Sequence, residues 1–298
     1  MTLPWVVSWA TGLSEGFAPL TVVSVAGLAV LGASFLLAWG AETAEKDVPR
    51  AFAIAVLAVL AVAPEYAVDA LYAWTAGANV GTPRGAEAAN LAVANMTGAN
   101  RILIGLGWSG IALFSIYKAT SGSRADTSVV NREGTLRDAV KLDPSISTEI
   151  LFLFLATVFA FFVPLNGGID AIDTIVLVGL YVTYIAIIIR GDVEDHDEQI
   201  GVPAYFQAKP RGVRVPIVLA LFAYSGFLIF TAVEPFAHGL ESLGLRFGIP
   251  EFFMIQWIAP LASESPELIV TAYLVNKARS TAAFNALISS KLNQWTLL

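Results

Sequence analysis

The chain has 298 residues, of which 56% are hydrophobic and only 14% charged, and its mean hydropathy is +0.70. A soluble domain carries about a quarter charged residues, so this composition indicates a protein embedded in lipid. The absence of cysteine excludes a disulfide scaffold and thiolate metal sites, and two histidines are too few for a histidine-built zinc or copper centre. The net charge of −7, without a dense basic patch, excludes nucleic acid as a partner.

Eight apolar segments are long enough to cross a bilayer as helices, which takes about 20 apolar residues each. They lie near residues 20–40, 51–74, 90–117, 147–164, 169–189, 215–236, 251–275 and 280–298. The segment that precedes them, residues 1–19, is expected to lie at the membrane surface, outside the first span. The predicted fold class is therefore all-α, a polytopic membrane helix bundle with about eight transmembrane helices.

The positions of lysine and arginine predict the orientation of the chain. With the N-terminus outside, 13 of the 17 basic residues fall in cytoplasmic loops, and only Arg84 and Arg246 fall in outside loops. The remaining two, Arg101 and Lys291, lie within predicted spans. This excess follows the positive-inside rule and favours a multi-pass protein of the cell membrane.

Two long polar loops, 119–146 and 190–213, come out cytoplasmic in this orientation. The second carries an acidic run from Asp192 to Glu198 around His196. We expect this run to be a solvated loop at the membrane face, and a calcium-sensing or pH-sensing patch is the alternative.

A weak internal repeat recurs with an offset of roughly 200 residues. The first copy reads WGAETA (39–44), then Pro49, then AVAPE (61–65) and ANMTGANRI (94–102). The second copy reads HGLESL (238–243), then Pro250, SESPE (263–267) and FNALISSKL (284–292). Five spans precede the second copy, so the two copies enter the membrane from opposite sides, as the inverted repeats of secondary transporters do. The expected regions are 20–118 for the first repeat, 119–214 for the loops and spans that link the copies, and 215–298 for the second repeat.

A Pro-Glu pair lies within one predicted span of each copy, Pro64–Glu65 and Pro266–Glu267. Proline removes a backbone donor and is expected to break or kink each helix, which frees carbonyl oxygens beside a carboxylate. Intramembrane carboxylates are costly and indicate function. Oxygens of this kind are the ligands that calcium takes, six to eight at a time, so the two pairs predict a cation site.

Four other charged residues lie in the predicted spans of the two copies. Asp69 follows Glu65 by one helical turn and Glu264 precedes Glu267 by three residues, so both are further candidates for ion binding or proton carrying. Arg101 and Lys291 are candidate countercharges, and a fixed positive charge near the carboxylates would lower the affinity for a metal ion.

These motifs resemble those of the calcium/cation antiporter superfamily, the sodium/calcium exchanger-like membrane proteins, whose repeats read G-T-S-x-P-E and G-N-x-x-G-S-N-x-x-N/D. The matching residues are Ser263, Pro266, Glu267, Asn285, Ser289 and Asn293 in the second copy, and Pro64, Glu65, Asn95, Gly98 and Asn100 in the first. The resemblance implies a ten-helix fold, of which the chain would lack the last two helices. It also implies a metal site that contains Glu65, Glu267, Ser263, Ser289 and Asn293, with Asn95 and Asn285 as further candidates.

The first copy departs from the family pattern, with Ala61 and Val62 before Pro-Glu and Ala99 and Leu103 on the next helix. The leading hypothesis is a secondary antiporter that exchanges Ca2+ against Na+ or H+ by alternating access. Monovalent Na+/H+ exchange and a degenerate, non-transporting scaffold remain open. An intramembrane hydrolase is disfavoured, because neither H-E-x-x-H nor G-x-S-x-G occurs. The chain is thus not expected to be an enzyme or to carry a cofactor, and its partners are inorganic cations and the lipid bilayer.

Overall fold

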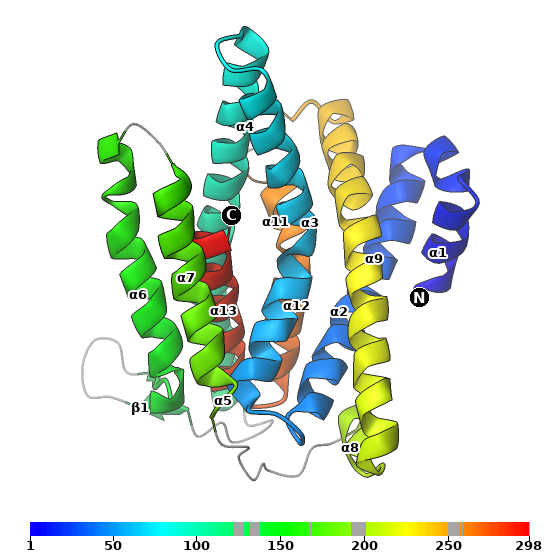
Figure 1. Cartoon of the computed structure of the whole chain (residues 1–298). Coiled ribbons are helices and arrows are strands. Elements are labelled where there is room, and N and C mark those ends of the chain that lie inside the picture. The colour runs from blue at the N-terminus through cyan, green and yellow to red at the C-terminus, as the bar shows by residue number, and fades with distance from the viewer. Residues whose placement is uncertain are drawn as a thin grey trace.

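The computed structural model describes residues 1–121, 128–131, 138–166, 169–191, 201–249, 257 and 259–297. In these ranges the chain forms a bundle of long helices with one small two-stranded ribbon (Figure 1). Within the described residues, five helical stretches are long and apolar enough to cross a membrane: Pro19–Ala44, Met96–Thr120, Ser147–Leu165, Ala171–Ile188 and Arg211–Arg246. Within the described residues Arg50–Val62 is a shorter apolar helix, and the helices Ser265–Asn276 and Ser280–Leu297 occupy described parts of the last two predicted spans.

The helices before the ribbon are α1 (Leu3–Ala10), η1 (Leu13–Gly16), α2 (Pro19–Ala44), α3 (Arg50–Ala78), α4 (Pro83–Asn100), the π-helical η2 (Arg101–Trp108) and α5 (Ser109–Thr120). After it come η3 (Pro144–Ile146), α6 (Ser147–Ala160), η4 (Val163–Asn166), α7 (Ala171–Ile188), α8 (Val202–Gln207), α9 (Arg211–Arg246), α11 (Ala259–Ser263), α12 (Ser265–Asn276) and α13 (Ser280–Leu297). The local sequence explains where one of these helices begins. A capping box opens α7, where the Asp170 carboxylate accepts from the Asp173 N–H and the Asp173 carboxylate accepts from the Asp170 N–H.

Helices α2 and α9 lie against each other and run in opposite directions (Figure 1). A Cβ added at Gly239, near the end of α9, would lie 2.8 Å from Val23 at the start of α2. Near the end of α2, one added at Gly40 would lie 3.1 Å from Phe222, which belongs to the first half of α9. The glycines therefore permit the close approach of these helices, the first of each repeat copy.

The other corresponding helices also run in opposite directions. At the end of α5, Ser115 is 2.8 Å from Ser280 at the start of α13, measured between the hydroxyl oxygens. The end of α12, at Lys277, contacts Glu42 at the end of α2, after which α3 begins. We call this part of the bundle, where α2, α5 and α12 end and α3 and α13 begin, the loop end. The arrangement is that of two inverted repeats.

The loop 119–146 contains secondary structure that the sequence did not predict. Strands β1 (Val129–Asn131) and β2 (Asp138–Val140) pair antiparallel, with Val130 opposite Ala139. Val140 and Leu142 pack against the buried core of the bundle. The apolar residues in this otherwise polar loop explain the ribbon, which is a small departure from an all-α chain.

The expected surface position of residues 1–19 is wrong for α1. Trp5 is buried, and its indole N–H donates to the Thr231 hydroxyl at 3.1 Å. Thr231 lies near the middle of the 36-residue α9. The short helix therefore packs along the α2–α9 pair instead of lying outside the first span.

The two Pro-Glu pairs differ in their effect on the helix. In the second copy the chain breaks at Glu264, and Pro266 occupies the first turn of α12, where its missing N–H needs no partner. In the first copy α3 continues through Pro64, so of the predicted break or kink the break is wrong there. Pro216 and Pro235 likewise lie inside the continuous helix α9.

Candidate ion-binding site

Two carboxylates are buried at the break between α11 and α12. Glu264 forms the junction, and its backbone N–H donates to the Pro260 carbonyl at 3.0 Å. Glu267 lies in the first turn of α12, where the helix dipole favours a negative charge. Both side chains are buried, while the Ser263 hydroxyl is half-buried and donates to the Pro260 carbonyl at 3.1 Å. The predicted residues Ser263, Glu264 and Glu267 thus lie together.

The neighbouring helix α13 contributes amides to this region. Gln294, which the sequence analysis missed, donates from Nε2 to Glu264 Oε1 at 2.8 Å. The adjacent Asn293 is fully buried, and neither polar atom of its amide hydrogen-bonds within the described residues. Buried amides normally have partners. The unsatisfied carbonyl oxygen and N–H2 group of Asn293 are therefore suited to a ligand.

The other two predicted residues of α13 contact α6 and α7. The hydroxyl oxygens of Ser289 and Tyr184 lie 3.1 Å apart. The amide of Asn285 lies beside the carboxyl of Glu149, a residue of the first turn of α6. Neither Glu149 nor Tyr184 was predicted, although Glu149 is an acidic residue inside a predicted span and that signal could have identified it.

The first copy is described in part. The side chains of Glu65 and Asn95 lie outside the described part of the structure, although the backbone places them on α3 and α4. Asp69, one turn beyond Glu65, is buried. A Cβ added at Gly98 of α4 would lie 2.7 Å from Pro260 Cγ. The motif segments of the two copies therefore touch at α4 and α11.

The two candidate countercharges occupy different environments. Lys291 is buried, and its ammonium nitrogen lies 5.1 Å from the centroid of the Trp295 ring. Arg101 is exposed, and its guanidinium carbon lies 5.4 Å from the centroid of the Trp257 ring. Only Lys291 of the two therefore places its side chain in the interior of the bundle, on the helix that also carries Asn293 and Gln294.

No group of three or more acidic or histidine side chains forms a metal cluster within the described residues. The acidic run from Asp192 to Glu198 lies outside them. A cation held in the described part of the bundle would thus need neutral oxygens, such as amide and hydroxyl oxygens, beside a small number of carboxylates.

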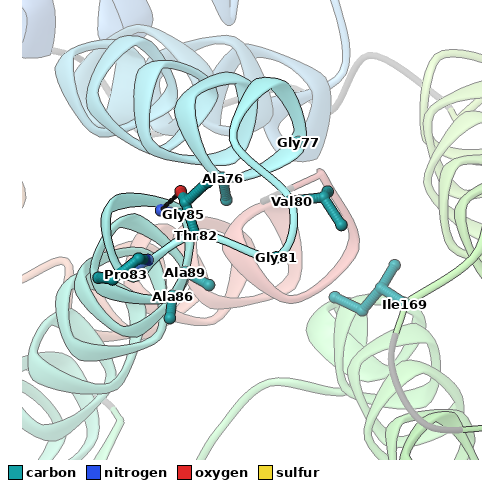
Figure 2. Close-up of a pocket in the computed structure, with 10 residues that line it drawn as sticks. All are labelled: Ala76, Gly77, Val80, Gly81, Thr82, Pro83, Gly85, Ala86, Ala89 and Ile169. Carbon is teal, nitrogen blue, oxygen red and sulfur yellow. Dashed lines mark hydrogen bonds between the residues drawn. The ribbon is translucent and has the colours of Figure 1, made fainter.

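A hollow of about 950 Å3 opens at the turn between α3 and α4 (Figure 2). This turn lies at the end of the bundle opposite the loop end (Figure 1). Ile169 reaches toward the hollow, and Thr82 caps α4 by accepting from the Gly85 N–H at 3.2 Å. None of its ten lining residues is charged, so the hollow is a poor candidate for a cation site. A second, mostly apolar groove of about 470 Å3 lies between α6, α7 and the end of α13, and Gln294 lines it.

A buried ionic network crosses the loop end of the bundle. Glu42 accepts from the Tyr273 hydroxyl at 2.8 Å, from Lys277 at 3.1 Å and from Arg279 at 2.9 Å. The carboxylate of Glu45 accepts from Arg279 at 2.6 and 2.7 Å. Burial by itself lowers the pKa of Arg279, but the charges of Glu45 and Glu42 outweigh that effect and raise it. The network ties the end of α2 to the turn between α12 and α13.

Comparisons with known proteins agree with this architecture. The model of the family described as "Sodium/calcium exchanger protein" matches residues 17–190 and 217–298. The crystal structure of the H+/Ca2+ exchanger CAX is 47% identical over 99% of this chain and 69% of that one, with a TM-score of 0.76.

A structure of the sodium-calcium exchanger NCX_Mj shares the fold, with a TM-score of 0.64 and 16% identity over 94% of this chain and 80% of that one. Comparison with curated protein sequences gives no match. The family match covers most of the chain, and the similarity to CAX extends over nearly all of it. The chain belongs to the sodium/calcium exchanger family of membrane cation antiporters and is not an enzyme.

Proposed function

We propose that this antiporter exchanges Ca2+ for H+, with Glu65 and Glu267 as the charged ligands of one site near the middle of the membrane. The observation that carries this proposal is the burial of Glu264, Glu267 and Asn293 around a broken helix. The name of the 47%-identical relative, an H+/Ca2+ exchanger, supports the choice of ions.

The chemistry of the site accounts for exchange. Calcium takes six to eight oxygen ligands, and Glu267, Ser263 and Asn293 offer side-chain oxygens beside the backbone carbonyls at the junction of α11 and α12. Two carboxylates would neutralise one Ca2+. Protons bind the same carboxylates and cancel the charge that attracts calcium, so the two kinds of ion occupy the site in turn.

The inverted repeats suggest how the site is exposed to each side. Helices α2 and α9 pack closely against each other, and we propose that this antiparallel pair moves as a unit against the helices that carry the motifs, α3, α4, α12 and α13. Alternating access in transporters built from inverted repeats works in this manner. We assign residues 20–118 and 215–298 to the two repeats and residues 119–214 to the segment between them.

The basic residues of the loop end support a cell-membrane protein whose N-terminus is outside and whose loops 119–146 and 190–213 are cytoplasmic. The ion pairs described at this end include Lys277 with Glu42 and Arg214 with Asp47.

Buried Lys291 favours a second candidate, monovalent exchange. A fixed positive charge in the interior of the bundle reduces the net negative charge there and weakens binding of a divalent cation more than binding of Na+ or H+. In this case Lys291 acts as the countercharge.

Flux through proteoliposomes tests the proposal and separates the two candidates. An outward-directed proton gradient should drive uptake of 45Ca2+, because proton exit is coupled to calcium entry, and Glu267→Gln should abolish that uptake. Glu15→Gln removes an exposed carboxylate of η1 and serves as the matched control. Calcium uptake that requires a sodium gradient and ignores the proton gradient would contradict H+ coupling. Proton-coupled Na+ flux without calcium flux would support the monovalent candidate.

A further inference from the structure

Glu149 is a buried acid that the proposed exchange site does not use. Its relative exposure is 0%, and neither carboxyl oxygen makes a hydrogen bond of ordinary geometry within the described residues, although the side-chain amide of Asn285 lies next to the carboxyl and interacts with it. The described side chains that interact with the Glu149 carboxyl are those of Asn285 and Tyr184, and both are uncharged. A buried carboxylate is strongly destabilised unless a positive species neutralises it.

Oxygen atoms surround this carboxyl. The carbonyl oxygen of Asn285 is buried and has no hydrogen-bond partner within the described part of the chain. Tyr184, whose hydroxyl is paired with that of Ser289 at 3.1 Å, lies close enough to feel the charge of Glu149. Carboxylate, amide and hydroxyl oxygens are the ligands of hard cations such as Ca2+.

The position of this cluster relates it to the Glu267 site. Asn285, Ser289 and Asn293 follow one another at intervals of four residues and share one face of α13. At 1.5 Å per residue, Asn285 lies about 12 Å along the helix from Asn293. Because α13 begins at the loop end, Glu149 and Asn285 lie between that end and the amides near Glu264.

We propose that Glu149, Asn285 and Ser289 form a second cation-binding site, on the loop-end side of the Glu267 site. The face of α13 supplies a row of polar groups that joins the two sites, and Ca2+ occupies the second site on its way between the Glu267 site and the loop end. The identity of the ion rests on the proposed function, whereas the site itself rests on the buried, unsatisfied oxygens.

Equilibrium binding of 45Ca2+ to the purified full chain in detergent isolates the second site, provided that the Glu267 site has first been disabled. Glu267→Gln should retain weak binding of Ca2+. Adding Glu149→Gln should lower the remaining Ca2+ affinity by at least about 10–100-fold, the loss that follows mutation of residues that support metal ligands. Glu149→Asp in the same background keeps the charge and should retain measurable binding. Glu15→Gln in that background is the matched control for loss of an exposed carboxylate, and should leave the residual binding unchanged.

Thermal melts establish that each variant is folded, so that a loss of binding is not a loss of structure. The second site is supported if Glu149→Gln/Glu267→Gln loses the residual binding while Glu149→Asp/Glu267→Gln and Glu15→Gln/Glu267→Gln keep it. Absence of residual binding in Glu267→Gln, or equal residual binding with and without Glu149→Gln, would overturn it while the exchange site stands. Wild-type binding that Glu267→Gln leaves unchanged would overturn the proposed function instead, and the effect of Glu149→Gln would still decide the second site.

Discussion

The ionic network at the loop end gives the sharpest prediction for stability. Arg279 is 16% exposed and donates to two carboxylates whose side chains are 1% and 3% exposed, those of Glu42 and Glu45. Arg279→Met removes the charge and keeps an apolar side chain of similar length. Glu42 would retain Tyr273 and Lys277. Glu45 would lose both of its hydrogen bonds to Arg279 and keep the more distant Arg50, whose Nε lies 4.0 Å from Glu45 Oε2.

The expected cost follows from burial. Removing one partner of a buried ion pair destabilises a protein by about 3–5 kcal/mol, because the other charge loses its compensation. For a chain of this size each kcal/mol lowers the melting temperature by about 2–4 °C. Arg279→Met should therefore lower it by roughly 6–20 °C. Lys277→Met should cost less, because the Glu42 carboxylate keeps its hydrogen bonds to Arg279 and Tyr273.

Thermal melts of the purified chain in detergent measure both effects. The double variant Glu45→Gln/Arg279→Met removes both charges of the pair, so it should melt at a higher temperature than Arg279→Met alone. A melting temperature of Arg279→Met within about 2 °C of the wild type would refute the reasoning. So would a double variant that melts below Arg279→Met, because buried Glu45 would then not depend on the arginine charge.

Two further predictions concern packing and pH. Gly98→Ala should destabilise the chain by about 1–3 kcal/mol, because the added Cβ would lie 2.7 Å from Pro260 Cγ. Gly105→Ala is the control, because nothing lies within 4 Å of its added Cβ. Equal melting temperatures for the two variants would contradict the close contact. The hydrogen bond to Arg214 lowers the pKa of Asp47, so Asp47 stabilises the fold above the ordinary aspartate pKa of about 3.9 and loses that contribution as the pH falls through the lower, folded value. Asp47→Asn should therefore melt below the wild type at pH 7 and converge with it in acid, and a gap between the two melts that is constant with pH would contradict the ion pair.

The membrane architecture was predictable from the sequence because its signals are local. Long apolar runs identify spans, and the recurrence of Pro-Glu before an Asn-containing helix identifies two copies of opposite direction. Proline itself was a less reliable guide. Pro64 and Pro266 share the same local motif, yet only the second lies at a helix break, so the motif alone does not decide whether a helix continues.

The partners of the site residues were not predictable, because they come from distant segments. Nothing in the residues around Ser289 indicates that Tyr184 of α7 lies 3.1 Å away, or that the neighbour of Asn285 is Glu149 of α6. The burial of Trp5 was missed for the same reason, since its partner Thr231 is 226 residues away. Spacing along one helix shows which residues share a face, but not which helix that face contacts.

The central claim is that Glu65 and Glu267, one from each repeat, bind calcium together, and a calcium-dependent thermal melt tests it most directly. At about a hundred times its dissociation constant, a ligand of the folded state adds ~2.7 kcal/mol of stability. The wild-type chain should melt at a higher temperature with Ca2+, acid should oppose the rise, and Glu65→Gln/Glu267→Gln should abolish it while Glu15→Gln leaves it intact. A wild-type melt that does not respond to Ca2+, or a double variant that responds as the wild type does, would contradict the claim.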